Sequence, residues 1–166
     1  MKYNKEEFLN IIESHKRLIY KIVNAYCQDK QNHQDLFQDI IMQLWSSFEN
    51  YDEKYKLSTW IYRIALNTSI SFHRKSIKRD AHIVDLPTIL ETTIKSEVSR
   101  IEDPKLETLN RFIQELREID KALILLYLDG LSQKEISHVM GISATNVGTK
   151  LSRIKKILRN KFQNLN

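Results

Sequence analysis

Apolar residues recur at intervals of three and four along most of the chain, which is the spacing that gives an α-helix one buried face. Only three glycines and two prolines interrupt the 166 residues. The pattern predicts seven helices, over residues 5–26, 34–48, 58–78, 105–116, 119–129, 133–140 and 144–162. We therefore expect an all-α protein.

Residues 80–104 break this pattern. They contain both prolines, and residues 81–104 carry 2 basic side chains against 5 acidic ones. On either side Lys and Arg exceed Asp and Glu, by 13 to 10 over residues 1–80 and by 11 to 6 over residues 105–166. We predict two small helical domains, 1–79 and 105–166, joined by a flexible linker and each suited to a polyanion. Ordinary solvated surface is the alternative explanation of this charge.

Cysteine content and hydropathy indicate a compartment. The single cysteine, Cys27, excludes an internal disulfide and suits a reducing environment. No charged-then-apolar leader opens the chain, and its longest apolar run, Ala122–Leu128, is far shorter than the ~20 residues of a membrane span. We expect a soluble, cytoplasmic protein that does not insert into a membrane.

The stretch from Ser132 to Arg159 has the spacing of a helix-turn-helix. Its small residue, its turn glycine and its branched apolar residue are Ser137, Gly141 and Val147. The small residue lets the two helices approach, the glycine adopts a positive φ, and the branched residue packs the second helix on the first. Ser132 and Ser143 are predicted N-caps, and Glu135 completes a capping box with the first of them.

The predicted third helix carries a polar face that suits nucleic acid. At steps of four, four, three and four it has Arg63, Asn67, Ser71, Arg74 and Lys78. Lys75 adds a cation near its end, and no acid lies between Glu53 and Asp80. Cations neutralise phosphates, while amides and hydroxyls hydrogen-bond base edges. The alternative is a solvated face whose cations interact with the helix dipole.

Aromatic residues near this helix are candidates for stacking on unpaired bases. Tyr51 and Tyr55 lie in the preceding loop, where we expect them to be loosely held. Trp60 lies on the apolar stripe, which favours core packing for it. That stripe comprises Leu57, Trp60, Ile61, Ile64, Ala65, Thr68 and Phe72.

Three stretches together resemble one protein family. They are DLFQDIIMQLW (35–45), LSTWIYRIALNTSISFHRK (57–75) and YLDGLSQKEISHVMGISATNVGTKLSRIKKIL (127–158). They resemble bacterial sigma-70-type RNA polymerase sigma factors, and in particular the extracytoplasmic-function (ECF) group, which has two domains and a linker. The resemblance runs from about residue 8 to residue 158 in the family's order and spacing.

This resemblance implies contacts with core RNA polymerase. Asp35, Leu36, Gln38 and Asp39 match the family's main contact with the clamp of the β′ subunit, and the β flap is the second polymerase partner implied. A solvated polar surface is the alternative for this helix. Leu36 is also a candidate core residue.

The resemblance also implies two contacts with promoter DNA. The −10 reader corresponds to Arg63, Asn67, Ser71, Arg74, Lys75 and Lys78, and the loop with Tyr51 and Tyr55 matches the segment that captures a flipped base. Many relatives have an acid in place of Ser71, so their −10 preference does not transfer. The −35 reader corresponds to Ser143, Thr145, Asn146, Thr149, Lys150 and Arg153. Gly148 departs from the usual larger polar residue and would permit close approach to DNA.

We therefore predict an ECF sigma factor without catalytic activity, cofactor or metal. It would direct core polymerase to −10 and −35 elements and aid promoter melting, and family habit adds an anti-sigma partner. A stand-alone helix-turn-helix repressor or activator is one alternative. A nuclease is another, in which Asp35, Asp39, Glu49 and Asp52 bind metal, but the histidines show no ligand spacing and there is no Gly-rich phosphate loop.

Overall fold

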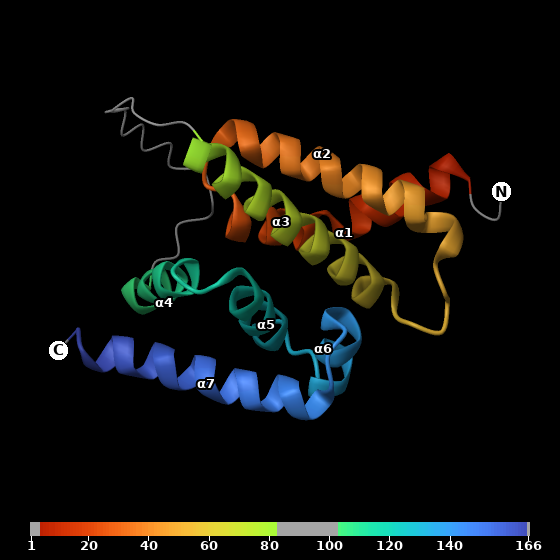
Figure 1. Cartoon of the computed structure of the whole chain (residues 1–166). Helices are drawn as coiled ribbons and strands as arrows, with labels where there is room; N and C mark the ends of the chain where they lie inside the picture. Colours follow the sequence, from red (N-terminus) through yellow and green to blue (C-terminus); the bar gives the residue numbers. More distant parts are fainter. Residues whose placement is uncertain (1–3, 83–102, 166) are drawn as a thin grey trace. The chain divides into compact units, whose positions relative to one another are not determined.

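The computed structural model describes residues 4–82 and 103–165, with only the backbone described from residue 78 to residue 82. All the regular secondary structure in these ranges is helical (Figure 1). They are α1 (Lys5–Tyr26), α2 (Lys30–Ser47), the short 3-10 helix η1 (Phe48–Asn50), α3 (Leu57–His82), α4 (Pro104–Gln114), α5 (Glu118–Leu128), α6 (Gln133–Met140) and α7 (Ala144–Gln163). The prediction of an all-α protein is confirmed.

The chain divides into two compact units, one with α1–α3 and the other with α4–α7. The backbone of α3 continues to His82, beyond its predicted end at residue 78. Most of the predicted linker lies outside the described residues, so the domain limits at 79 and 105 stay predictions.

The first unit is a three-helix bundle around one apolar core. Each helix contributes side chains that are almost fully inaccessible to solvent, namely Ile19, Ile22 and Val23 from α1, Leu36, Ile40 and Leu44 from α2, and Ile61, Ala65 and Leu66 from α3. Burial of each large aliphatic side chain contributes about 1.5–3 kcal/mol. This core fixes which faces of α2 and α3 remain outside.

Side-chain caps define where α1 and α2 begin. The Asn4 side chain accepts a hydrogen bond from the Glu7 backbone at 2.8 Å, and Glu7 returns the bond to the Asn4 backbone at 3.0 Å. The Asp29 carboxylate accepts from the backbone of Asn32 at 2.9 Å. Because Asp29 satisfies these free N–H groups, α2 begins at Lys30 and not at the predicted residue 34.

The buried face of α3 differs from the predicted stripe. Ile61 and Ala65 are buried as expected, but Ile64, Thr68 and Phe72 are only half-buried. The buried residues that the prediction left out are Tyr62, Leu66, Ser69 and Ile70. The stripe prediction is therefore wrong by about one residue around the helix, because α3 packs against both α1 and α2 and buries a broad arc.

The second unit contains the helix-turn-helix as α6 and α7. The Ser132–Glu135 capping box is present, with bonds of 3.2 and 2.9 Å, and Ser143 accepts from the Asn146 backbone at 3.1 Å. Gly141 has φ +68° at the end of α6. These predicted caps and the turn glycine are confirmed. The inward stripe of α7 is fully buried and comprises Val147, Leu151, Ile154 and Leu158.

Candidate nucleic-acid interface

The α3 polar face consists of Arg63, Asn67, Ser71 and Arg74, and all four residues are exposed. Their steps of four, four and three keep them on one side of the helix, away from the core of the first unit. Lys75 is also exposed and, four residues after Ser71, lies at the edge of the same face. The side chain of Lys78, the sixth predicted residue, lies outside the described residues. The structure thus brings five of the six predicted residues together along a stretch of helix that contains no acid.

The loop before α3 is held by its own side chains. The Tyr51 hydroxyl donates to the Tyr55 carbonyl at 2.6 Å, and the Tyr51 ring lies 5.2 Å from the Trp60 ring. Trp60 also meets Phe48, with ring centroids 6.0 Å apart. The prediction of a loosely held side chain is therefore wrong for Tyr51, while Tyr55 keeps 47% of its surface exposed. Trp60 is half-buried, in agreement with its predicted packing.

Two carboxylates lie near the Tyr51 hydroxyl. Burial raises the pKa of Tyr51, and the nearby charges of Glu53 and Asp52 raise it further. Asp52 also shapes the turn, because its carboxylate accepts from the Lys54 backbone at 3.0 Å. An aromatic surface therefore lies at the start of α3, with the Tyr51 and Trp60 rings in contact and the exposed Tyr55 in the same loop.

The outward face of α2 carries the predicted polymerase residues with one exception. Asp35 and Gln38 are exposed, and Asp39 is half-buried. Leu36 is 0% exposed, so its predicted contact with a partner is wrong: it packs in the core of the first unit. The same outward face includes two exposed apolar residues, Met42 at 61% and Trp45 at 44% exposure.

The α7 outer face consists of Thr145, Asn146, Thr149 and Arg153, which are all exposed. Lys150 beside it is half-buried. The Thr149 hydroxyl donates to the Thr145 carbonyl at 3.1 Å. Ser143 uses its hydroxyl oxygen to cap the helix, so its first role is to fix where α7 begins. From Ala144 to the end of the chain there are six Lys and Arg residues and no acid, which favours contact with a polyanion.

Two of the later cations of α7 have partners inside the second unit. The Lys155 ammonium lies 4.6 Å from the centre of the Tyr127 ring. Lys161 forms an ion pair with Glu115 and lies 5.3 Å from the centre of the Phe112 ring. These contacts fix the C-terminal half of α7 on α4 and α5, whereas Arg153 projects into solvent.

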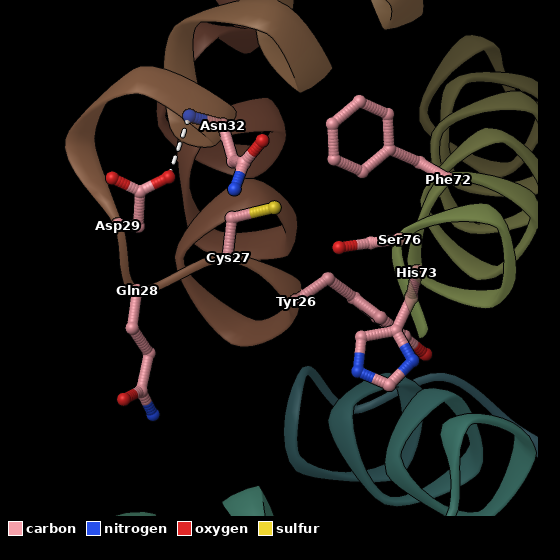
Figure 2. A pocket seen from close by; sticks show the side chains of 8 residues that line it. All are labelled: Tyr26, Cys27, Gln28, Asp29, Asn32, Phe72, His73 and Ser76. Atoms are coloured by element: carbon pink, nitrogen blue, oxygen red, sulfur yellow. Dashed lines mark hydrogen bonds between the residues drawn. The ribbon is translucent and has the colours of Figure 1, made fainter. Parts of the chain in front are cut away.

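A small pocket of about 240 Å³ lies where α1 ends, α2 begins and the second half of α3 passes (Figure 2). Its lining residues are Tyr26, Cys27, Gln28, Asp29, Asn32, Phe72, His73 and Ser76. None of the predicted DNA or polymerase residues lines it. The edge of the Tyr26 ring faces the His73 ring at 6.4 Å, which closes one side by packing.

In the described part of the chain, no group of three or more His, Cys, Asp and Glu residues is arranged to hold a metal ion. No helix within the described ranges combines the length and the apolar character needed to cross a membrane.

Comparison with known proteins decides the family. A model of sigma-70 region 2 matches residues 11–79, and a model of sigma-70 region 4 matches residues 106–158. Together they match more than two thirds of the chain. The chain belongs to the sigma-70 family of RNA polymerase sigma factors. Within it, the chain is an ECF sigma factor, similar to the ECF RNA polymerase sigma factor SigM of Bacillus subtilis strain 168. The two are 29% identical over 144 residues, covering 85% of this chain and 86% of that protein.

Solved structures of sigma factors share the fold of this sigma factor. CnrH in complex with the cytosolic domain of CnrY has a TM-score of 0.69 at 17% identity, covering 98% of this chain and 92% of that chain. RpoE in complex with the anti-sigma factor NepR from Bartonella quintana has a TM-score of 0.66 at 18% identity, covering 96% of each chain. The predicted family and fold are confirmed, and sigma factors act as transcription initiation factors and not as enzymes.

Proposed function

We propose that this ECF sigma factor binds core RNA polymerase through α2, reads the −10 element with α3 and its preceding loop, and reads the −35 element with α7. The observation that carries the proposal is the exposure of the α3 polar face and the α7 outer face, one on each unit, on acid-free stretches of sequence. Both faces combine cations for phosphates with neutral polar groups for base edges.

The α3 polar face and the aromatic surface at its start support a role in promoter melting. Extrusion of a base from duplex DNA costs a few kcal/mol. Stacking on an aromatic side chain returns about 1–3 kcal/mol per base. Tyr55 is exposed and the Tyr51 ring packs beside Trp60, so this surface suits stacking by an unpaired base, while Asn67 offers a donor and an acceptor.

The outward face of α2 supports the polymerase contact. Asp35 and Gln38 offer carboxylate and amide groups to a basic or polar partner, and Met42 and Trp45 add apolar surface beside them. Aromatic residues and methionine are enriched in protein interfaces. We place the action of the protein in the cytoplasm, where bacterial polymerase works.

An anti-sigma partner is the regulatory part of the proposal. RpoE is bound to the anti-sigma factor NepR, and CnrH to the cytosolic domain of CnrY. The shared fold supports a similar mode of control here, by a partner that competes with polymerase or DNA for the same surfaces.

Run-off transcription tests the proposal. Purified host core polymerase is incubated with fragments of the host genome, with and without this protein. Discrete transcripts that require both proteins are the expected result. Tight binding to a palindromic duplex without polymerase would instead support the stand-alone regulator, and magnesium-dependent cleavage of plain DNA would support the nuclease.

A further inference from the structure

A side chain from α6 lies against the one position of α7 that has no side chain. A Cβ atom placed on Gly148 would lie 3.1 Å from Oε1 of Gln133, 3.4 Å from its Nε2 and 3.5 Å from its Cδ. All three atoms belong to the carboxamide group. The Gln133 carboxamide therefore occupies the space that a side chain at position 148 would enter.

The contact between Gln133 and Gly148 lies where a side chain could reach DNA bases. Gly148 directly precedes Thr149 of the α7 outer face, and it is half-buried on the flank that meets α6. Gln133 is the first residue of α6 and is exposed. In a helix-turn-helix the first helix crosses the DNA backbone while the start of the second enters the major groove. The Gln133 carboxamide, which lies between the two helices, is therefore placed close to the DNA backbone and to the major groove.

We propose that Gln133 is a specificity-determining residue for the −35 element, because its carboxamide fills the space beside Gly148. The inference rests on the proposed function. A carboxamide has a donor and an acceptor side by side, so it can pair with N6 and N7 of adenine in the major groove. Gly148 leaves room for the carboxamide, because a Cβ atom at this position would lie 3.1 Å from Oε1 and would push the group by a few tenths of an ångström.

Selection from a promoter pool with a randomised −35 element tests the inference. Holoenzyme with wild-type protein is compared with Gln133→Ala and with the control Lys134→Ala, an exposed neighbour on α6. We expect Gln133→Ala to reduce preference at one or two adjacent −35 positions by about tenfold, the effect of losing a bidentate base contact. Preference at the −10 element and the whole profile of the control should not change.

Two outcomes would overturn the inference. A uniform loss of binding across all sequences would mean that Gln133 contacts phosphate or supports the packing of α6 on α7. An unchanged −35 profile would mean that its carboxamide only fills space. If the wild-type holoenzyme initiates normally, either result leaves the proposed function intact. Failure of the wild-type holoenzyme to initiate would overturn both.

Gly148→Ala provides an independent variant, because the added methyl group pushes the carboxamide by a few tenths of an ångström while α7 gains a better helix former. We expect it to alter preference at the same −35 positions, and the double variant Gln133→Ala/Gly148→Ala to match Gln133→Ala alone. Changes at different positions, or effects that simply add, would contradict the inference. Amide hydrogen exchange of α6 and α7 shows that each variant remains folded.

Discussion

Single side chains of the helix-turn-helix divide into those that fix the backbone and those that remain available to DNA. Ser132 and Ser143 accept hydrogen bonds from the first turns of α6 and α7, so they set where these helices begin. Gly141 reverses the chain between them. Arg153 has the opposite character, since it is exposed on the α7 outer face. Substitution of a residue that fixes the backbone should lower stability, whereas substitution of a residue available to DNA should lower promoter affinity.

Substitution of Arg153 should weaken promoter binding without unfolding the protein. We expect Arg153→Ala to reduce the affinity of reconstituted holoenzyme for a −35-containing promoter by about tenfold, the effect of losing one charged DNA contact. Filter binding or fluorescence anisotropy measures this affinity. Arg17→Ala, which removes an exposed cation from α1, is the matched control. Equal affinity of the Arg153 variant and the wild-type protein would show that Arg153 does not contact DNA.

Substitution of Gly141 should instead destabilise the second unit. A φ of +68° costs about 1–2 kcal/mol for a residue with a Cβ atom, so Gly141→Ala should lower the unfolding free energy of α4–α7 by that amount. Amide hydrogen exchange in the full chain measures it. Both tryptophans, Trp45 and Trp60, belong to the first unit, so their fluorescence during urea unfolding should not change. Unaltered exchange in α6 and α7 would contradict the prediction.

Residue roles that depend on neighbouring residues were predicted well from the sequence. Contacts between residues far apart in the sequence were harder to predict. The caps at Ser132 and Ser143 depend only on neighbouring residues, so spacing was sufficient to find them. The spacing made Leu36 a candidate core residue, which its burial confirms, whereas the family resemblance also assigned it to the polymerase contact. The contact of Tyr51 with Trp60 joins the loop to α3, and no periodic pattern reports such a contact.

At the level of helices, α2 shows how one element serves two purposes. Leu36, Ile40 and Leu44 follow four-residue steps on its inner face and stabilise the bundle. Asp35 and Gln38 lie on the exposed outer face of α2 and are not part of the core of the bundle. Charge on the outer face can therefore be changed without loss of the fold.

Reversal of charge on this face should impair polymerase binding. We expect Asp35→Lys to reduce the affinity for core polymerase at least about tenfold, because a like charge opposite a basic partner is repelled. Glu13→Lys, at an exposed position of α1, controls for net charge. Surface plasmon resonance with immobilised core polymerase measures both variants, and tryptophan fluorescence verifies their folding. Wild-type affinity for the Asp35 variant would exclude this face as the contact.

Helix limits followed from the sequence where caps and periodicity agreed. Residues 5–26 and 133–140 were predicted as α1 and α6, and both were confirmed to the residue. The start of α2 was placed too late because Asp29 was not identified as its cap. The buried arc of α3 was misjudged because two helices cover it, and a single-stripe pattern does not describe such a helix.

On the scale of the whole molecule, the proposed function requires the two units to act together. Each unit presents one polar, cationic helix face of a few residues, which is too little for tight and specific binding alone. Joining two weak readers on one scaffold raises their effective concentration and therefore their combined affinity. Core polymerase is the scaffold in this account, and it is also the reason that the free protein should bind promoters poorly.

Footprinting of one promoter with free protein and with holoenzyme tests this central claim most directly. Hydroxyl radicals report duplex contacts, and permanganate reports unpaired thymines. The account predicts that holoenzyme protects an upstream duplex segment and exposes reactive thymines in a separate downstream segment, while free protein or core polymerase alone does neither. Protection of a palindromic duplex by free protein, with no melted segment when polymerase is added, would contradict it.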